Sequence, residues 1–549
     1  MNLMTDRTDE PSSYRWLYAL IALGVFANFA PLFVTIIGGD GTLYASIAKH
    51  MARQNDYVNM VAEGRDWLDK PHFPFWVTAI FFEVFGIHGW SYKLPAILFL
   101  MMGVWYTYLF ANRFYNKQTA LVAVVILLTA EHILLSSNDV RAEPYLTGLI
   151  IGAVYHLVLL RDKFYWRHLI AGSIFAACAV MTKGIFALLP VGGAIIGHLA
   201  LTGSMRDLLK PRWFAAVFLI VLFITPELYC LWLQFDQHPA KIIFGQTHVS
   251  GLRFFFWDSQ FGRFFNTGPI KGKGDPTFFI HTTLWAFLPW SILLFIAIGQ
   301  RFRKFRHPGL EWYSFFAAML TFLLFSLSRF QLPHYLNIVF PFFAVMTADY
   351  LIRNKSGVIA RRIYKMQLTL LILIFLGAVA LQVFYKPAAS GWLLLMTGVA
   401  IVVALSPRNR QLVSRRIITL SAGGIVMINL YLFWILYPDL LKYQAGSEAA
   451  IIANSNYPGV PVVQYKQHSY PLEFYLDASA TFIDTLTALD SIQRPFLLFT
   501  AELPDTATTV KKADTRLFPN FRISKLNIKF IDRNRRLKQL QWSKLELIR

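Results

Sequence analysis

About a dozen apolar segments follow one another between Trp16 and Tyr437, and each is roughly long enough to cross a bilayer. No other feature of the chain constrains its fold so strongly. Hydrophobic residues make up 56% of the 549 positions and charged residues only 15%, which is too apolar for an ordinary soluble protein of this length. The sequence therefore predicts an α-helical integral membrane protein.

Basic residues gather in alternate connections between these apolar segments. Short cytoplasmic loops of membrane proteins are enriched in Lys and Arg, and this enrichment sets orientation. We therefore assign the net charge of +21 to topology signals that contact anionic membrane lipids, and not to a nucleic-acid partner. The basic clusters are Arg113/Lys117, Arg161/Lys163/Arg167, Arg206/Lys210/Arg212, Arg301/Arg303/Lys304/Arg306, Arg353/Lys355/Arg361/Arg362/Lys365 and Arg408/Arg410/Arg415/Arg416.

With these clusters inside, the chain is expected to cross the membrane about thirteen times. Its N-terminus then lies inside and its C-terminal segment outside, and residues 1–437 form the transmembrane domain. The predicted spans are 16–37, 93–111, 119–136, 144–160, 168–183, 185–201, 213–234, 277–300, 309–327, 333–352, 366–385, 391–405 and 417–437.

Two parts of the chain are expected to be structured outside the membrane. In the long first external segment, Leu43–Ala48 and Phe75–Phe82 are predicted to be helices at the membrane interface. Residues 438–549 are of mixed polar and charged composition, which indicates a small external α/β domain. Its predicted strands lie near Val462–Tyr465, Phe496–Phe499 and Ile528–Ile531.

Several kinds of site and segment are not indicated. Cys178 and Cys230 lie within apolar segments, so the sequence predicts neither a disulfide framework nor a cysteine-based zinc site. We find no Walker motif, no dinucleotide fingerprint and no internal repeat like that of many transporters. The first apolar run has no small-residue cleavage site, and we expect it to be retained as an anchor.

Isolated acids stand at the outer ends of predicted spans. Asp40 follows the first span, where a carboxylate should face water or a partner, because burial in hydrocarbon costs about 2.5–3.5 kcal/mol. Capping of the next helix is the alternative role for Asp40. Asp139 and Glu143 follow the third span and would share one face of a helix. Pro144 disfavours a helix before it unless it opens the next helix, so which of the two acids points inward stays open.

Cations in the same external connections are candidates for binding an anion. Lys70, beside Asp69, is placed to hold a phosphate oxygen near the membrane surface, although an ordinary hydrated pair has the same pattern. Lys271 and Lys273 alternate with glycines, which suits either the wrapping of an oxyanion or a flexible loop. Arg329 lies on the face where positive charge is otherwise sparse, which makes it a candidate ligand contact.

Several of these motifs, in this order, resemble a known family. The chain resembles the polyprenyl-phosphate-sugar glycosyltransferases of the multi-span GT-C fold, a group that includes the protein O-mannosyltransferases. It is most similar to the bacterial transferases that add aminoarabinose to lipid A, which also have thirteen spans and an external C-terminal domain. The matching motifs are the acid after the first span, Asp69-Lys70-Pro71, Glu143-Pro144, Thr182-Lys183-Gly184 and the segment from Ser328 through Leu332-Pro333-His334-Tyr335 to Pro341.

The resemblance implies roles for single residues. Asp40 matches the acid regarded as the catalytic position, and Glu143 matches the acid of the second external loop, with Asp139 as its neighbour. Lys70 matches the lysine that contacts the lipid phosphate, and His248 and Arg253 resemble the pair near that phosphate. Arg329 stands near a family lysine, and Tyr335 resembles a tyrosine that helps to close the site. No cofactor is required; a divalent metal, if used, would be held by Asp69 and His248, although Asp69 replaces a family glutamate.

The expected function is therefore transfer of a sugar from a polyprenyl-phosphate donor to a lipid A, glycan, other lipid or protein acceptor, with inversion at the anomeric carbon. Lys70 and Arg253 would stabilise charge on the leaving phosphate, and Asp40 would accept the proton of a hydroxyl acceptor. We expect a monomer in the bacterial inner membrane with its site facing the periplasm. The alternatives are a lipid or solute transporter and an O-antigen ligase or polysaccharide polymerase.

Overall fold

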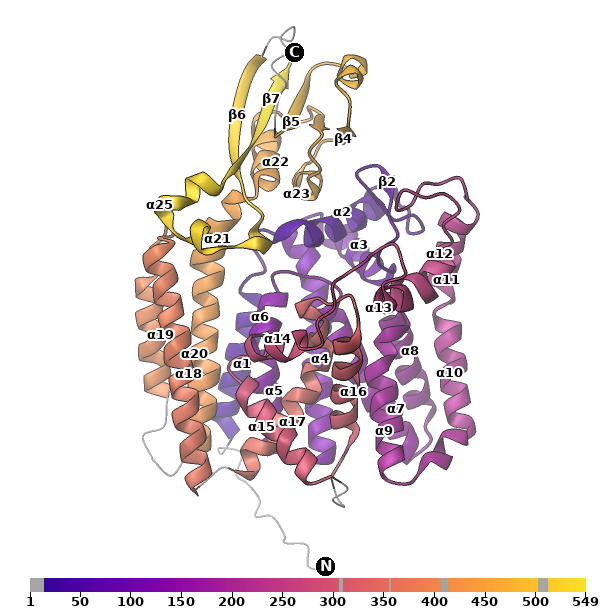
Figure 1. Cartoon of the computed structure of the whole chain (residues 1–549), viewed down its shortest axis with the longest axis vertical. Helices are drawn as coiled ribbons and strands as arrows, with labels where there is room; N and C mark the ends of the chain where they lie inside the picture. The colour runs from indigo at the N-terminus through magenta and orange to yellow at the C-terminus, as the bar shows by residue number, and fades with distance from the viewer. Residues whose placement is uncertain (1–13, 306–309, 355–356, 406–412, 502–511) are drawn as a thin grey trace, which may run out of the picture.

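The protein is a bundle of long helices topped by a smaller layer that contains a β-sheet (Figure 1). The computed structural model describes residues 14–305, 310–354, 357–405, 413–501 and 512–549. The prediction of a helical protein of membrane type is confirmed. Within the described residues, six helical runs are long and apolar enough to cross a membrane: α4 (Gly89–Phe114), α7 (Glu143–Asp162), α10 to η4 (Pro211–Asp236), η6 to α17 (Pro333–Arg353), α18 (Gly357–Phe384) and the run from α20 to η8 (Val413–Tyr443).

The other predicted spans also contain helices, most of them shorter. Proline explains two of the breaks: Pro289 lies between α14 and α15, and Pro226 lies where α11 follows α10. The number of membrane crossings stays a prediction. These further helices are α1 (Arg15–Phe29), α5 (Lys117–Leu128), α6 (Glu131–Ser136), α8 (Trp166–Lys183), α9 (Leu189–Leu201), α14 (Phe278–Ala286), α15 (Ser291–Arg303), α16 (Tyr313–Leu327) and α19 (Trp392–Leu405). The long run Pro211–Asp236 is itself divided into α10 (Pro211–Phe223), α11 (Thr225–Leu231) and η4 (Trp232–Asp236).

Small residues allow helices at the centre of the bundle to approach closely. A Cβ atom at Gly148 of α7 would lie 2.1 Å from the backbone oxygen of Phe99 of α4, and one at Gly103 would lie 3.0 Å from the Cα of Gly148. Helices that pack in a membrane commonly meet through such small residues, because close backbone contact maximises dispersion. The α4–α7 contact holds the start of α7, where Glu143 stands, against the core of the bundle.

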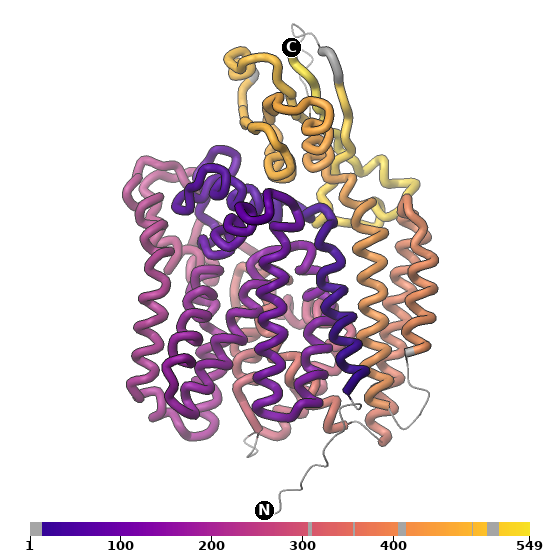
Figure 2. Tube along the Cα trace, turned by 180° about the vertical axis from the view of Figure 1, so that it is seen from behind, coloured from indigo at the N-terminus to yellow at the C-terminus, as the bar shows by residue number. Residues whose placement is uncertain are grey.

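The first external segment forms two helices over one end of the bundle (Figures 1 and 2). The predicted helices are confirmed as helices and are longer than expected: α2 covers Gly38–Gln54 and α3 covers Phe73–Phe85. A short hairpin of β1 (Val61–Ala62) and β2 (Arg65–Asp66) lies between them. The segment that joins β2 to α3 carries Asp69 and Lys70.

The C-terminal layer has a five-stranded sheet in the order β4-β3-β5-β7-β6. Strand β3 (Val462–Tyr465) pairs in parallel with β4 (Ala480–Ile483) and β5 (Phe496–Thr500), and β7 (Gln541–Ile548) is antiparallel to β5 and β6 (Lys512–Asn520). Helices α22 (Ala445–Asn456) and α23 (Tyr470–Tyr475) belong to the same layer. The last membrane-type helical run continues past Pro438 to Tyr443. The domain boundary at residue 437 stays a prediction.

One predicted strand is wrong. Ile528–Ile531 forms the short helix α24, because the side chain of Asn527 accepts a hydrogen bond from Phe530 N at 2.9 Å and so starts a helical turn. The apolar ring of Phe530 is buried beside Tyr443, with 5.1 Å between ring centroids. Burial therefore accounts for the apolar run, but its local geometry is helical.

Hydrogen bonds attach the C-terminal layer to the beginning and the middle of α2. Lys49 Nζ donates to the backbone oxygens of Glu473, Phe474 and Leu476 at 2.6–2.9 Å. Just before α2, Gly38 N donates to Gln444 Oε1 at 2.9 Å, and Gln444 Nε2 donates to Ile36 O at 3.2 Å. The layer thus holds the backbone two residues before Asp40. Of the basic clusters, Arg306, Lys355, Arg408 and Arg410 lie outside the described residues.

Candidate active site

Three cationic side chains line one cavity at the end of the bundle beneath α2 and α3. Lys70, Lys183 and Arg263 share this cavity of about 70 Å³ with the carboxylate of Asp69. Its polar lining also includes Ser259, Gln260 and Ser328. The rest is apolar: Pro71, Leu146, Phe186, Ala187, Phe264, Phe325, Phe330, Ile338 and the ring face of Tyr335. A cavity with this lining suits a ligand that has an anionic head and an apolar body.

Asp69 holds two of these cations in place. Its Oδ2 accepts from Lys70 Nζ at 2.8 Å, and its Oδ1 accepts from Arg263. Burial alone would raise the pKa of Asp69, but Lys70 and Arg263 lower that pKa to about 2. Burial lowers the pKa of Lys70 to about 8 against the opposing effect of Asp69. One acid therefore serves two cations, and part of their charge is left for a ligand.

A buried ion pair anchors the backbone just after Lys70. His72 N donates to Glu227 Oε2 at 2.9 Å, its Nδ1 lies 3.0 Å from Glu227 Oε1, and its Nε2 lies 2.9 Å from Val58 O. Burial would lower the pKa of His72, but the adjacent Glu227 and the Val58 carbonyl raise it above its usual value, which favours the imidazolium. Both side chains of the pair are fully buried. Glu227 on α11 thus positions the segment that presents Lys70.

The third cation, Lys183, stands at the end of α8 and pairs with Glu143 at the start of α7. Its Nζ also lies 3.6 Å from the ring centroid of Tyr335, a cation–π contact. Pro144 does open a helix, because α7 begins at Glu143. Glu143 is therefore buried and points inward, and His334 Nε2 lies 3.9 Å from its Oε1.

A glycine shapes the turn beside Lys183. Gly184 has φ +89°, and a Cβ atom there would lie 2.2 Å from Gln260 Nε2. That amide nitrogen donates to the backbone oxygen of Lys183 at 3.0 Å, and Gln260 Oε1 accepts from Phe186 N at 3.2 Å. Gln260 belongs to the π-helical segment η5 (Phe254–Gly262), so it joins the large loop to α8 through this turn.

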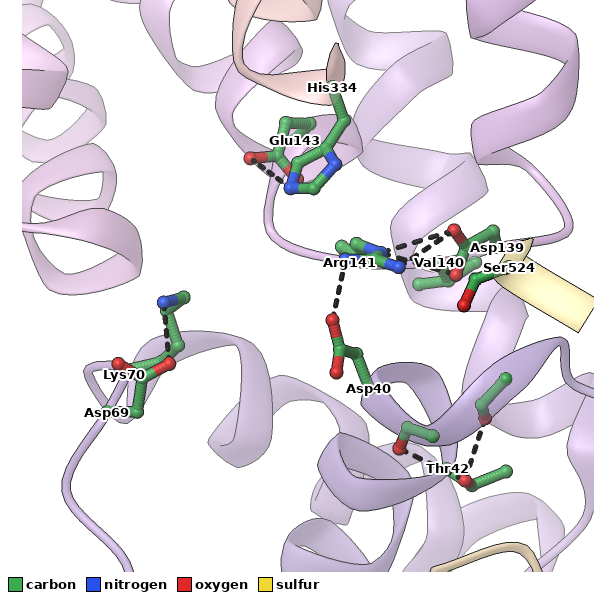
Figure 3. A network of polar contacts seen from close by, with 12 residues as sticks. Asp40, Thr42, Asp69, Lys70, Asp139, Val140, Arg141, Glu143, His334 and Ser524 are labelled. Carbon is green, nitrogen blue, oxygen red and sulfur yellow. Dashed lines mark hydrogen bonds and ion pairs between the residues drawn. The ribbon is translucent and has the colours of Figure 1, made fainter. Parts of the chain in front are cut away.

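Arg141 joins two of the predicted acids (Figure 3). Its guanidinium lies 2.7 Å from Asp40 Oδ2 and 3.2 Å from Asp139 Oδ2. Burial raises the pKa of Asp139 against the opposing effect of Arg141, and the two carboxylates raise the pKa of Arg141 although burial would lower it. The alternative role of Asp40 as a helix cap is wrong, because α2 begins at Gly38 with Ile37 as its cap. Asp40 lies in the first turn and its side chain is 58% exposed.

A narrow crevice joins the main cavity to Arg141. Lys70, which lines the main cavity, also lines this crevice together with Arg141, Tyr44 and Thr182. Figure 3 shows the Asp69–Lys70 pair on one side of the site and the pair of Asp40 and Arg141 on the other. The crevice thus leads from Lys70 to Arg141, the ion-pair partner of Asp40.

Five predicted binding residues lie outside the lining of the cavity and the crevice. The side chains of His248, Arg253, Lys271, Lys273 and Arg329 are all exposed. Arg253 is 75% exposed and lies 3.7 Å from Asp258, so the expected approach of Arg253 to Lys70 is not observed. Arg329 does not line the cavity, whereas its neighbours Ser328 and Phe330 do.

The glycines between Lys271 and Lys273 have a packing role. A Cβ atom at Gly272 would lie 2.6 Å from Arg329 O, and one at Gly274 would lie 2.6 Å from Ser328 O. The loop therefore runs directly along the backbone at residues 328–330, where only glycine fits. The loop therefore supports the backbone of Ser328 and Phe330, which line the cavity, while Lys271 and Lys273 are exposed.

The metal prediction concerned Asp69 and His248. Asp69 is engaged by Lys70 and Arg263, and His248 Nδ1 lies 3.2 Å from Thr247 Oγ1. Among the residues that the structure describes, no group of three or more His, Cys, Asp or Glu side chains could hold a metal ion. Metal dependence stays a prediction, and the described part of the chain offers no donor set for a metal ion.

Sequence reasoning did not select Arg141, Lys183 or Arg263 as site residues. Arg141 carries the same signal that selected Arg329, a basic residue in a loop on the face where positive charge is sparse. Lys183 belongs to a motif that was noted, and Arg263 lies in the large loop, where several cations were equivalent by sequence. Their pairing with Glu143 and Asp69 joins segments far apart in the chain, and no local pattern reveals it.

Comparison with known proteins agrees with this site. The profile of the dolichyl-phosphate-mannose-protein mannosyltransferase family matches residues 69–230, a range that begins at Asp69 and contains Lys70, Arg141, Glu143 and Lys183. The undecaprenyl phosphate-alpha-4-amino-4-deoxy-L-arabinose arabinosyl transferase of Edwardsiella ictaluri is 26% identical over 320 residues, which are 57% of this chain and 55% of that protein.

A protein of Aquifex aeolicus is 26% identical over 363 residues, 64% of this chain and 66% of that protein. The sequence similarity thus spans between about half and two thirds of these relatives. The structural similarity extends further: ArnT from Cupriavidus metallidurans, crystallised with undecaprenyl phosphate, superimposes with a TM-score of 0.75 and 18% identity over 97% of this chain and 98% of that one. The chain therefore has the fold of ArnT, and the resemblance of its motifs to the GT-C glycosyltransferases close to the aminoarabinose transferase is confirmed.

Proposed function

We propose that this protein is a membrane glycosyltransferase that takes its sugar from a polyprenyl phosphate. The observation that carries the proposal is the convergence of Lys70, Lys183 and Arg263 on one cavity whose remaining lining is largely apolar. A polyprenyl-phosphate sugar has the same division, with one charged phosphate between a sugar and a long hydrocarbon chain. The names of the similar proteins, with undecaprenyl phosphate as donor or bound lipid, support this choice.

The cations act on the leaving group. The donor phosphate carries one negative charge as a diester and gains a second when the bond to the anomeric carbon breaks. Lys70, Lys183 and Arg263 are held in place before the reaction, so they stabilise this growing charge without reorganising. The apolar walls exclude water and strengthen the interaction. Phe186, Phe264 and Phe330 would contact the first units of the lipid chain.

Asp40 acts on the acceptor. The acceptor oxygen bonds to the anomeric carbon from the side opposite the phosphate, the carbon–oxygen bond to the phosphate breaks, and its electron pair leaves with the polyprenyl phosphate. When the acceptor is a hydroxyl group, Asp40 takes its proton. Arg141 orients Asp40 for this step through their ion pair. An ionised phosphate acceptor needs no base, and Asp40 and Arg141 would then position it. The displacement inverts the anomeric carbon.

We also propose the finer topology expected from the sequence: about thirteen crossings, a C-terminal α/β domain outside, and a site that faces the periplasm of a bacterial inner membrane. The proposed acceptor is lipid A, another envelope lipid, a glycan or a protein, and the proposed working unit is a monomer. Transfer is proposed to need no cofactor, with a divalent metal as the alternative; Lys70 and Arg263 each engage one oxygen of Asp69. Full activity after EDTA treatment would support that point.

The test is a product assay on purified protein in lipid nanodiscs. Undecaprenyl-phosphate aminoarabinose and lipid A are supplied together or singly, and mass spectrometry measures free undecaprenyl phosphate and modified lipid A. The proposal predicts release of undecaprenyl phosphate that depends on an acceptor. A transporter would leave the donor intact. Other polyprenyl-phosphate sugars and a polyprenyl-diphosphate sugar extend the assay, and cleavage of the diphosphate donor alone would favour a ligase or polymerase.

A further inference from the structure

The helices α18, α19 and α20 carry positive charge without any acid to balance it. Between Asp349 and Asp439 the sequence contains no Asp or Glu. At the end of this group far from the C-terminal layer stand Arg361, Arg362 and Lys365 on α18 and Arg415 and Arg416 on α20 (Figure 1). The sequence places no carboxylate on these helices, so a counter-charge must come from another part of the chain or from outside it.

An apolar groove begins about one helical turn from two of these cations, Lys365 and Arg416. It measures about 250 Å³, and residues of all three helices line it. Helix α20 packs against both α18 and α19, and its residues Leu420, Gly424, Met427 and Ile428 are part of the lining. Gly398 on α19 and Gly424 on α20 lie in the groove, where a Cβ atom would lie 2.9 Å from Met427 and 3.0 Å from Leu371 respectively. Every lining residue is apolar.

The groove and the cations lie on the same helix faces. On α20, Arg416 precedes the lining residue Leu420 by four positions, and on α18, Lys365 precedes the lining residue Leu368 by three. Arg416 donates to Tyr364 Oη at 3.2 Å, which links the two helices below the groove. The Nε atoms of Arg415 and Arg416 are buried, and neither has a hydrogen-bond partner among the described residues. The side chain of Arg416 is only partly buried, so the terminal nitrogen that does not bond to Tyr364 can donate to an anion at the end of the groove.

We propose that this groove binds one anionic phospholipid of the bilayer, with its acyl chain between α18 and α19 and its phosphate at Arg416 and Lys365. Basic pockets between transmembrane helices recognise anionic lipid headgroups in this way. A second copy of the chain fits less well, because a symmetric contact through these helices would bring like charges together without an acid. The groove is separate from the proposed donor cavity, because the two share no lining residue and the cavity is lined by other segments.

The test uses native mass spectrometry of the purified, delipidated full chain titrated with phosphatidylglycerol or phosphatidylcholine. The variant Lys365→Gln/Arg416→Gln removes two charges at the groove. The matched control Arg362→Gln/Lys386→Gln removes two charges elsewhere on or just after α18, on residues that do not line the groove. Wild type and control are expected to retain one phosphatidylglycerol, bound about tenfold or more tightly than phosphatidylcholine. The groove variant is expected to lose most of that preference.

A second variant tests the acyl-chain site. Val399→Trp places a large ring in the groove and is expected to lower the binding of both lipids while the headgroup preference of the remaining binding is kept. A thermal melt and the transferase assay show that each variant is folded. Equal binding of the two phospholipids by wild type, or equal loss in the groove variant and its control, would overturn the proposal. Displacement of phosphatidylglycerol by equimolar undecaprenyl phosphate would assign the groove to that lipid instead.

Discussion

The guanidinium of Arg141 lies 2.7 Å from the carboxylate of Asp40, although the two residues are a hundred positions apart and belong to different external segments. The same guanidinium lies 3.2 Å from Asp139. One cation thus bridges two carboxylates, and this ion pair orients the side chain of Asp40. Because Asp40 is the proposed base, Arg141 is proposed to act through it.

Arg141→Gln is expected to lower kcat about a hundredfold, because Asp40 loses its orienting partner and faces Asp139 without a cation. Asp40→Asn is expected to lower kcat by a similar or larger factor. The double variant should be no worse than Asp40→Asn, since the two residues act as one unit. The measurement is kcat of the single and double variants with a hydroxyl acceptor. Arg113→Gln is the control, because its exposed partner Asp162 is remote from the site. Multiplicative losses in the double variant would contradict the assignment.

Replacement of the cavity cations is expected to weaken donor binding and to slow transfer. Lys70→Gln and Arg263→Gln should each lower kcat/KM for the donor at least about tenfold, because each removes a charge-assisted hydrogen bond to the phosphate. The matched control is Arg253→Gln, in the same large loop as Arg263 but 75% exposed and outside the lining of the cavity. Steady-state kinetics at varied donor concentration gives kcat/KM for each of the three variants. A larger effect at Arg253 than at Arg263 would show that the loop rearranges when the donor binds.

The value of kcat/KM for the donor is expected to fall at alkaline pH. Burial lowers the pKa of Lys70 to about 8, so Lys70 is charged below pH 8 and becomes neutral as the pH rises through that value. The pKa of Asp69 is lowered to about 2, and this acid stays ionised throughout. Therefore kcat/KM for the donor should fall above pH 8, since this ratio reports the free enzyme. In Lys70→Arg the fall should disappear, because arginine stays charged. A fall that persists in Lys70→Arg would assign it to another group.

The buried pair of His72 and Glu227 is expected to contribute to stability and to the placement of Lys70. Glu227→Gln leaves a buried imidazolium without its counter-ion, and removal of one partner of such a pair costs about 3–5 kcal/mol. Burial would lower the pKa of His72, but Glu227 raises it above its usual value. A raised pKa gives stability that is complete below the unfolded value and is lost as the pH rises through the folded value.

Two measurements check this pair. The melting temperature of wild type should fall as the pH rises above the folded pKa of His72. The melting temperature of Glu227→Gln should not show this dependence on pH. Glu83→Gln is the control, since Glu83 accepts a hydrogen bond from Tyr57 at the exposed surface. Below its melting temperature, Glu227→Gln should also show a higher KM for the donor, because the segment after Lys70 is no longer anchored. An unchanged KM would limit the pair to a structural role.

The sequence predicted the parts of the fold that depend on local composition. Apolar segment length predicted helices at every proposed span. Two segments that form the site were also predicted, by the motifs Asp69-Lys70-Pro71 and Glu143-Pro144. The partner of each residue depends on tertiary packing, which composition does not encode. Glu143 pairs with Lys183 and Asp69 with Arg263, across forty and nearly two hundred positions. For the same reason, Arg253 and Arg263 looked equivalent by sequence although only Arg263 lines the cavity.

The C-terminal layer is expected to influence catalysis through Gln444. Its side chain accepts from Gly38 N and donates to Ile36 O, just before the turn that carries Asp40. Gln444→Leu has similar volume but removes both bonds, so α2 can shift at its start. We expect kcat to fall about tenfold while donor KM is unchanged, because Lys70, Lys183 and Arg263 are attached elsewhere. Gln467→Leu is the control, since Gln467 contacts Ser543 within the C-terminal layer. Both variants should lose some thermal stability, but only Gln444→Leu should lower kcat below its melting temperature. Equal kcat in the two variants would mean that Gln444 only attaches the C-terminal layer to the bundle and does not position Asp40.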